Sequence, residues 1–397
     1  MFATVFAIII GIFAGTITGI TPGIHLNLVA ALTLANASLL LQYSTLENIV
    51  IALIAMATTH TFLDSIPSTY LGVAESEKVV SALPAQQLLL EGRGYEAVTL
   101  TTKGSLYGAI IMILLAPFLI KILPNFYSRI TWAIPTIILV SAIVLILQEK
   151  KKKEAIITFI FAAALGCIVL TSPSIKDPLL PLFSGLFGVS TLLLTCKDKP
   201  LIPPQTMQKE KSDRKETAKT LTAATIAGLF AGTLPGIGNA QIATLATALQ
   251  KTQTQRQYLI LTGALGTAIM VLSFITLYSL QKARNGAVVA IAELIPKMNQ
   301  EILVSATITI ISTAIIATAI TLWCAKRASS WILKINYQML CKITIAGIIL
   351  LTVLVVGPIG IIILITATAI GILPQKYGVA RSHLMACLIV PTVFYLI

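Results

Sequence analysis

The feature that most constrains this chain is a series of long apolar stretches with almost no charged side chains. They cover residues 104–123, 131–148, 155–172, 178–196, 302–325 and 340–356. A helix needs about 20 consecutive apolar residues to cross a bilayer, and these stretches are about that long. Charged residues make up 11% of the chain, against about a quarter in soluble domains. The sequence therefore predicts an all-α polytopic protein of the cytoplasmic membrane.

A doubled phrase divides the chain into two similar halves. Gly-x-Phe-Ala-Gly-Thr occurs at 11–16 and at 228–233, and each copy is followed by a Pro-Gly pair. Proline removes a backbone donor and glycine tolerates unusual backbone angles, so each pair predicts a broken helix, either re-entrant or discontinuous. We expect two structurally repeated halves, inverted relative to each other. The predicted units are a first membrane repeat, a charged cytoplasmic linker and a second membrane repeat, at 1–196, 197–219 and 220–397.

The two broken helices form the predicted substrate site. A helix that starts inside the membrane points unpaired amides and the positive end of its dipole inward, which favours an anion. Broken helices in corresponding positions of two repeats are typical of transporter binding sites. The predicted binding residues are Thr21, Pro22, Gly23, His25, Asn27, Pro235, Gly236, Gly238, Asn239 and Gln241. Close helix packing is the alternative role for the glycines of the doubled phrase, Gly11, Gly15, Gly228 and Gly232.

Asp64 is the predicted centre of ion coupling. It lies in an apolar segment rich in hydroxyl groups, as Glu293 lies in another apolar run. A charge at membrane depth costs about 2.5 to 3.5 kcal/mol, so such residues usually face a cavity and serve an ion path. His60 lies one helical turn earlier and Ser65 follows directly. His60 either forms a proton-coupling pair with Asp64 or serves as a structural hydrogen-bonder. The alternative is that neighbouring Ser and Thr hydroxyls satisfy Asp64 and fix a bend before Pro67.

The composition predicts no cofactor and no metal site, because no cluster of metal-ligating residues occurs; Na⁺ or H⁺ remains as the coupling ion. The net charge of +13 comes from basic residues in short loops between apolar stretches. This is the positive-inside pattern of membrane proteins and argues against a nucleic-acid partner. Arg93, Lys282 and Arg284 lie near membrane boundaries, where they either anchor the topology or line the entry route of the anion.

Several short strings resemble those of one transporter family. They are Gly15-Thr16, Pro22 to Asn27, Asp64 with Pro67, Leu83-Pro84, 89–97, 232–236, 277–284 and 371–385. In these strings the chain resembles the large membrane subunit of tripartite tricarboxylate transporters, the TctA-like family. The last two strings resemble its archaeal, stand-alone branch, and the resemblance covers nearly the whole chain.

The resemblance implies a secondary transporter with two repeated halves that moves carboxylates with an ion gradient. Bacterial relatives work with a soluble binding protein and a small membrane subunit. This chain departs from them in its second half, which has the segment 263–279 in place of a polar, Asn-rich segment with Pro-Gly. The departure leaves the substrate and the need for a binding protein open.

Three functions remain after this reasoning. The leading hypothesis is an ion-coupled transporter of an organic anion, which is not an enzyme. The alternative is a flippase for a lipid-linked phosphate such as a polyprenyl phosphate, since helix ends bind phosphate equally well. An intramembrane lipid-modifying enzyme would need His25, His60 and Asp64 to converge. The expected partners are thus the bilayer and a small organic anion or lipid phosphate, and a homo-oligomer stays open.

Overall fold

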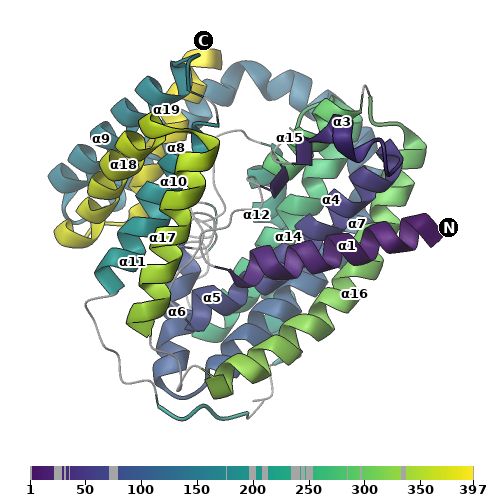
Figure 1. Ribbon diagram of the computed structural model, residues 1–397, viewed down its shortest axis with the longest axis horizontal. Helices are drawn as coiled ribbons and strands as arrows, with labels where there is room; N and C mark the ends of the chain where they lie inside the picture. Colours follow the sequence, from purple (N-terminus) through teal and green to yellow (C-terminus); the bar gives the residue numbers. More distant parts are fainter. Residues whose placement is uncertain are drawn as a thin grey trace.

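The computed structural model of the protein is helical throughout the part that it describes (Figure 1). It describes residues 2–396 except 22–28, 31–32, 35, 71–78, 176, 196–202, 208–212, 234–241, 243–245, 247–253, 284, 296 and 332–336. Seven helical segments in this part are long and apolar enough to cross a membrane. The predicted class, an all-α polytopic membrane protein, is therefore confirmed.

The first half of the chain contains the helices that the apolar stretches predicted, together with two long helices near its start. Its elements are α1 (Phe2–Ile20), α3 (Ala37–Leu40), α4 (Leu46–Leu63), α5 (Ser65–Tyr70), α6 (Val79–Leu90), α7 (Gly94–Ile130), η1 (Thr131–Ala133), α8 (Ile134–Gln148), α9 (Lys152–Thr171), α10 (Leu179–Phe183), the π-helix η2 (Ser184–Val189) and α11 (Ser190–Thr195).

The second half repeats much of this order. Its elements are α12 (Arg214–Thr233), α14 (Gln255–Leu280), α15 (Gly286–Leu294), α16 (Gln300–Trp331), α17 (Tyr337–Val355), α18 (Pro358–Tyr377), the short 3-10 helix η3 (Arg381–Met385) and α19 (Ala386–Leu396). Both halves thus place a helix that carries the doubled phrase before a long polar helix, which is α4 in one half and α14 in the other.

The helices gather into two lobes, each with its own apolar core (Figure 1). The first lobe contains α1 to α7, α12 and α14 to α16. The second lobe contains α8 to α11 and α17 to α19 with the short helices between them. The long helix α7 reaches both cores, since Ala109 lies in the first core and Tyr127 in the second. Each lobe therefore combines elements from both halves of the sequence.

Corresponding helices of the two halves pack in matching ways. Helix α1 packs along α4, and α12 packs along α14. Helix α4 also packs on α16 of the second half, while α14 packs on α7 of the first half. In the second lobe, α9 packs on α19 and α18 packs on η2. The repetition of the two halves, their inversion and their exact boundaries stay predictions.

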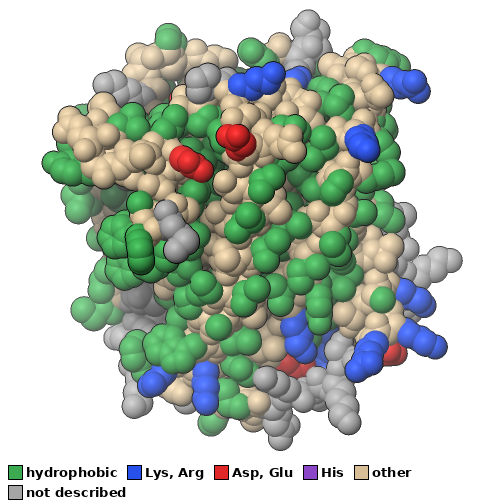
Figure 2. All heavy atoms as spheres, turned by 90° about the vertical axis from the view of Figure 1, so that its right-hand side faces the viewer, with side chains coloured by type: hydrophobic (Ala, Val, Ile, Leu, Met, Phe, Trp, Pro, Cys, Tyr) green, Lys and Arg blue, Asp and Glu red, His purple; other side chains and the backbone are tan. Residues whose placement is uncertain are grey.

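The outer surface suits a lipid environment. Figure 2 shows a face on which hydrophobic side chains cover the middle and charged side chains gather toward the upper and lower edges. Phe13 of α1 and Ile315 of α16 are more than half exposed. In contrast, α4 and α14 are buried along almost their whole length. The two helices that the sequence marked as hydroxyl-rich therefore lie at the centre of the first lobe.

The two acidic residues that the sequence placed in apolar runs have different surroundings. Asp64 is 8% exposed at the end of α4. Glu293 is exposed near the end of α15, a helix of nine residues. The apolar run around Glu293 forms only this short helix, so the run does not carry the carboxylate into the core. Asp64 is the one of the two that needs a functional or structural explanation.

Candidate transport site

Helices α1 and α4 approach each other closely at the first part of the site. Their contact is made by small residues: a Cβ at Gly15 would lie 2.5 Å from the carbonyl oxygen of Met56 and 2.7 Å from Cβ of Thr59. Gly11 makes a similar approach one turn earlier, against Ala52. Gly11 and Gly15 therefore allow the two helices to pack closely, which was the alternative role for these glycines. It brings the backbones near enough for short polar side chains to meet.

His60 of α4 is joined to α1 by a buried hydrogen bond. Its Nδ1 atom lies 3.0 Å from Oγ1 of Thr18, and the ring is 3% exposed. The Thr18 hydroxyl also lies 3.2 Å from the carbonyl oxygen of Gly15. The direction of the His60–Thr18 hydrogen bond depends on which ring nitrogen carries the hydrogen. The bond holds the His60 ring against α1.

Asp64 follows one turn after His60, where α4 meets α5. Its backbone N–H donates to the carbonyl oxygen of His60 at 3.0 Å. The hydroxyl of Ser65 donates to the carbonyl oxygen of Phe62 at 2.8 Å, and that of Ser68 donates to the carbonyl oxygen of Ser65 at 3.0 Å. A hydroxyl has one hydrogen, so neither of these two serines donates to the Asp64 carboxylate. Both the functional role of Asp64 and its role in fixing a bend stay predictions.

Helix α1 ends beside these residues, just before the first Pro-Gly pair of the sequence. The backbone N–H of Thr21 donates to the carbonyl oxygen of Ile17 at 3.0 Å, so the helical turn of α1 continues up to Thr21. Thr21 lies one turn beyond Thr18, which contacts His60. The other predicted binding residues of this break, Pro22, Gly23, His25 and Asn27, lie outside the described residues. Their role remains a prediction.

The second half has a related arrangement. Helix α12 ends at Thr233, and one residue earlier Gly232 packs against the side chain of Leu272 on α14. Ser273 and Thr276 on α14 are fully buried. The predicted binding residues that follow, Pro235, Gly236, Gly238, Asn239 and Gln241, also lie outside the described part of the chain.

The polar helices of the two halves meet in the core of the first lobe. Oγ1 of Thr61 on α4 lies 3.7 Å from Sδ of Met270 on α14, and both helices contribute to the largest apolar core. The ends of α1 and α12, where the breaks begin, each pack on one of these two helices. The two helices that precede the Pro-Gly pairs therefore pack on one pair of central helices, and the breaks themselves stay predictions.

Arg93 lies in an ion-pair cluster that joins the two halves. Its guanidinium binds Glu96 through Nε and Nη2, at 2.9 and 3.1 Å, and Glu91 at 3.2 Å. Nε of Arg256, at the start of α14, lies 2.9 Å from Oε1 of Glu96, the oxygen that Nη2 of Arg93 also binds. The hydrogen bond to Glu96 raises the pKa of Arg93 above its usual range. This position fits an anchor between α7 and α14, and a place on the entry route stays a prediction.

The linker between the halves is docked on the same turn. The N–H of Thr206 donates to the carbonyl oxygen of Gly92 at 2.7 Å. The side chain of Gln205 accepts from the N–H of Gly94 at 2.8 Å and donates to the carbonyl oxygen of Leu89 at 3.0 Å. The Glu-Gly-Arg-Gly string at 91–94 is thus a docking point for residues 203–207, which the sequence predicted only as part of a linker.

Glu96→Gln should reduce stability much more than Glu91→Gln. Glu96 is 5% exposed, and its loss removes the carboxylate that Arg93 and Arg256 share, at a cost of about 1 to 3 kcal/mol. The Glu91 side chain is 48% exposed, so its change should stay within about 0.5 kcal/mol. Unfolding of the purified variants in detergent measures the difference. Equal transition midpoints would contradict the anchoring role of Glu96.

Lys282 contacts Tyr127 near the end of α7. Its Nζ donates to the Tyr127 hydroxyl at 3.1 Å and lies 4.5 Å from the centre of the ring. The cation is thus held against the part of α7 that belongs to the second core. Arg284 lies outside the described residues, and the predicted entry role of both cations stays untested.

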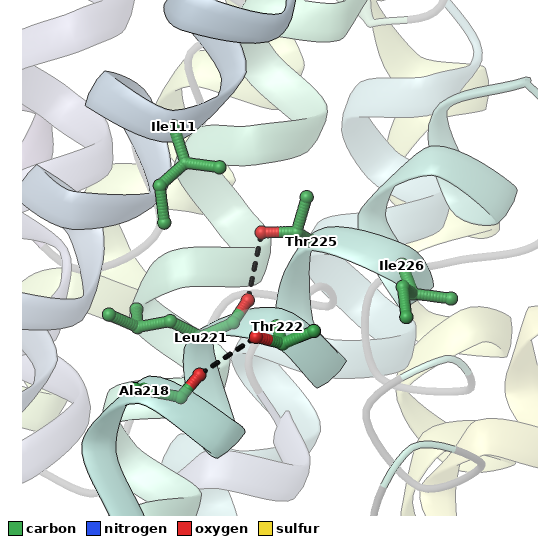
Figure 3. Close-up of a pocket in the computed structure, with 6 residues that line it drawn as sticks. All are labelled: Ile111, Ala218, Leu221, Thr222, Thr225 and Ile226. Carbon is green, nitrogen blue, oxygen red and sulfur yellow. Dashed lines mark hydrogen bonds between the residues drawn. The ribbon is translucent and has the colours of Figure 1, made fainter. Parts of the chain in front are cut away.

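A shallow groove lies between α7 and α12 (Figure 3). Its volume is about 390 Å³, and it is lined by Ile111, Ala218, Leu221, Thr222, Thr225 and Ile226. Both threonine hydroxyls donate to carbonyl oxygens of their own helix, as the dashed lines in Figure 3 show. The lining has no charged side chain and no hydroxyl hydrogen left for a ligand, so the groove suits an apolar occupant better than an anion.

Two features of this region had weak or no sequence signals. The Thr18–His60 contact joins residues 42 positions apart, and nothing in the doubled phrase marks Thr18 as a partner. Glu96 and Arg256 are ordinary loop charges in the sequence, and only their convergence makes them a cluster. Among the residues that the structure describes, no group of His, Cys, Asp and Glu is arranged to hold a metal ion.

The chain is similar to known proteins along nearly its whole length. Residues 5–386 match the family model described as the tripartite tricarboxylate transporter TctA family. An uncharacterized protein of Methanocaldococcus jannaschii is 32% identical over 399 residues, covering 98% of each chain. No solved structure matches this chain. Because the family match covers nearly the whole sequence, the chain belongs to the tripartite tricarboxylate transporter TctA family.

Proposed function

We propose that this protein is an ion-coupled secondary transporter that moves a small organic anion of the carboxylate class across the membrane. Membership of a family of transporters, and not of enzymes, supports an organic anion as the cargo. The observation that carries the mechanism is the buried pair His60 and Asp64, placed where α1 ends and the first break begins.

The coupling step follows from the surroundings of this pair. Asp64 is almost fully buried in a helix of a membrane protein, where an ionised carboxylate is costly. Binding of Na⁺ or H⁺ neutralises the carboxylate and removes that cost. His60, one turn away, offers a second protonation site. Binding of the cation and binding of the anion therefore favour each other. This mutual effect is the basis of coupled transport.

The substrate step rests on the sequence of the breaks. Helix ends at Pro22-Gly23 and Pro235-Gly236 supply unpaired amides for a carboxylate, and Asn27, Asn239 and Gln241 supply further donors. The packing of α1 on α4 and of α12 on α14 supports a common location for both breaks. The groove between α7 and α12 does not favour the flippase alternative, because its apolar lining offers nothing to a phosphate.

Proteoliposomes that contain the purified protein are expected to take up labelled carboxylates when a Na⁺ or H⁺ gradient is imposed. A panel with one, two and three carboxylate groups, tested with each gradient separately, identifies the substrate class and the ion. Liposomes without protein and liposomes with dissipated gradients are the controls. Uptake that is the same with and without both gradients would contradict ion coupling, and transfer of a labelled lipid phosphate without carboxylate uptake would favour a flippase.

A further inference from the structure

The second lobe contains a cation that the proposed transport site does not use. Arg381 begins η3, just after the loop that follows α18. Its Nη1 donates to the hydroxyl of Thr191, and its Nη2 lies 3.4 Å from the hydroxyl of Ser190. Ser190 is fully buried and Thr191 is 4% exposed. The guanidinium, which belongs to the second half of the sequence, therefore lies against the first turn of α11, which belongs to the first half.

Arg381 lacks the counter-charge that a buried guanidinium normally has. In the part of the chain that the structure describes, no carboxylate lies within ion-pair distance of it, and its buried Nε has no hydrogen-bond partner. Burial alone lowers the pKa of Arg381, to about 10. A buried charge without a partner is strongly unfavourable. The side chain as a whole is partly exposed, so an anion can approach it from the surface.

The hydroxyls beside Arg381 are oriented by a π-helix. Ser190 donates to the carbonyl oxygen of Leu186 at 2.7 Å, and Thr191 donates to that of Phe187. Both acceptors belong to η2, a type of helical turn that occurs frequently at functional sites. Because each hydroxyl uses its hydrogen on a carbonyl, its lone pairs are directed to the guanidinium. The two hydroxyls thus contact Nη1 and Nη2 of Arg381 and leave its remaining N–H groups for a ligand.

The segment that carries Arg381 is fixed in place by a neighbouring loop. The carboxylate of Glu149 accepts from the N–H of Ala380 at 2.8 Å and lies 3.2 Å from Nε2 of His383. Nζ of Lys151 donates to the carbonyl oxygen of Tyr377 at 2.8 Å. Both contacts use Oε1 of Glu149, and among the described residues no ion pair joins Glu149 to Arg381. The loop positions Arg381 but does not neutralise it.

We propose that Arg381, held by Ser190 and Thr191, forms an anion site in the second lobe, separate from the two Pro-Gly breaks, for the oxyanion of a small carboxylate or of a lipid headgroup. The planar guanidinium binds such groups through paired N–H donors. Lys151, which binds the end of α18, adds positive charge near this segment and raises the local concentration of anions. The choice of a carboxylate as probe rests on the proposed function.

The test compares Arg381→Gln with Lys376→Gln, which removes the same charge from an exposed position nearby. In neutral detergent, citrate should raise the unfolding temperature of the wild type and of Lys376→Gln. Arg381→Gln should lose this shift, with an apparent Kd at least about tenfold higher. Without ligand, Arg381→Gln should unfold at the same or a higher temperature, because the uncompensated charge is gone. Arg381→Lys, which keeps the charge and loses the paired donors, should bind more weakly.

A second arm separates the two sources of the anion. The same variants are measured in mixed micelles that contain either phosphatidylglycerol or phosphatidylcholine. A rise in the unfolding temperature with citrate alone identifies the ligand as a free carboxylate. A rise with phosphatidylglycerol alone identifies it as a lipid headgroup. The proposal is overturned if the wild type shows neither shift, or if Arg381→Gln keeps the full shift. Gradient-driven uptake by the wild type decides the proposed function independently of these results.

Discussion

Asp64→Asn is expected to abolish gradient-driven uptake while the protein still folds. The change replaces a buried carboxylate by an amide of the same shape. An ionised carboxylate at membrane depth costs about 2.5 to 3.5 kcal/mol. Binding of the coupling ion recovers this free energy, and Asp64→Asn removes the carboxylate on which that gain depends. At 1.4 kcal/mol for each factor of ten, gradient-dependent uptake should fall at least about tenfold.

The controls for Asp64→Asn use the same assay and a second acid. Glu293→Gln makes the same kind of change at an exposed position near the end of α15, so its uptake should equal that of the wild type. The unfolding midpoint of Asp64→Asn should be unchanged or higher, because an amide is easier to bury than a carboxylate. Unchanged coupled uptake in Asp64→Asn, with normal folding, would return Asp64 to a structural role.

The helices of this protein were largely predictable from the sequence. The apolar stretch at 131–148 corresponds to α8, and the stretch at 155–172 corresponds to α9. Length and lack of charge decide such helices locally, since the bilayer requires every spanning backbone to satisfy its own hydrogen bonds. The hydroxyl-rich segments that become α4 and α14 were also recognisable, because a helix with many polar groups cannot face lipid.

The division into lobes was not predictable in the same way. The sequence halves suggested two successive units, but packing joins α4 of the first half to α16 of the second, and α14 to α7. This choice depends on small residues that meet across helices. Gly263 of α14, for example, packs against the backbone of α7 at Thr101 and Ser105. A glycine in an apolar run gives no sign of which helix will approach it.

The polar sites show the same limit. Asp64 was recognisable because a lone acid in an apolar segment is rare. Arg381 looked like one more loop cation, since its significance depends on Ser190 and Thr191, about half the chain away. His60 was expected to act with Asp64, but its partner Thr18 on α1 follows only from the close approach of the two helices. A single charged residue in an apolar segment can be found from the sequence, whereas a pair of residues that only packing brings together cannot.

Gly15→Val is expected to prevent the correct packing of α1 on α4 and so to abolish uptake. The new Cβ would lie 2.5 Å from the carbonyl oxygen of Met56 and 2.7 Å from Cβ of Thr59, so the helices must move apart. Overpacking of this kind costs about 1 to 3 kcal/mol. The displacement also separates Thr18 from His60, whose hydrogen bond spans the same interface.

Gly347→Val is the matched control, because a Cβ at Gly347 in α17 would have no atom within 4 Å. Both changes replace a helical glycine by the same residue, and valine has the higher helix propensity. The effect of crowding is therefore separated from that of the backbone. Unfolding midpoints in detergent and uptake in proteoliposomes should fall for Gly15→Val and stay at wild-type values for Gly347→Val. If both variants behave alike, the close contact between α1 and α4 does not position the coupling residues.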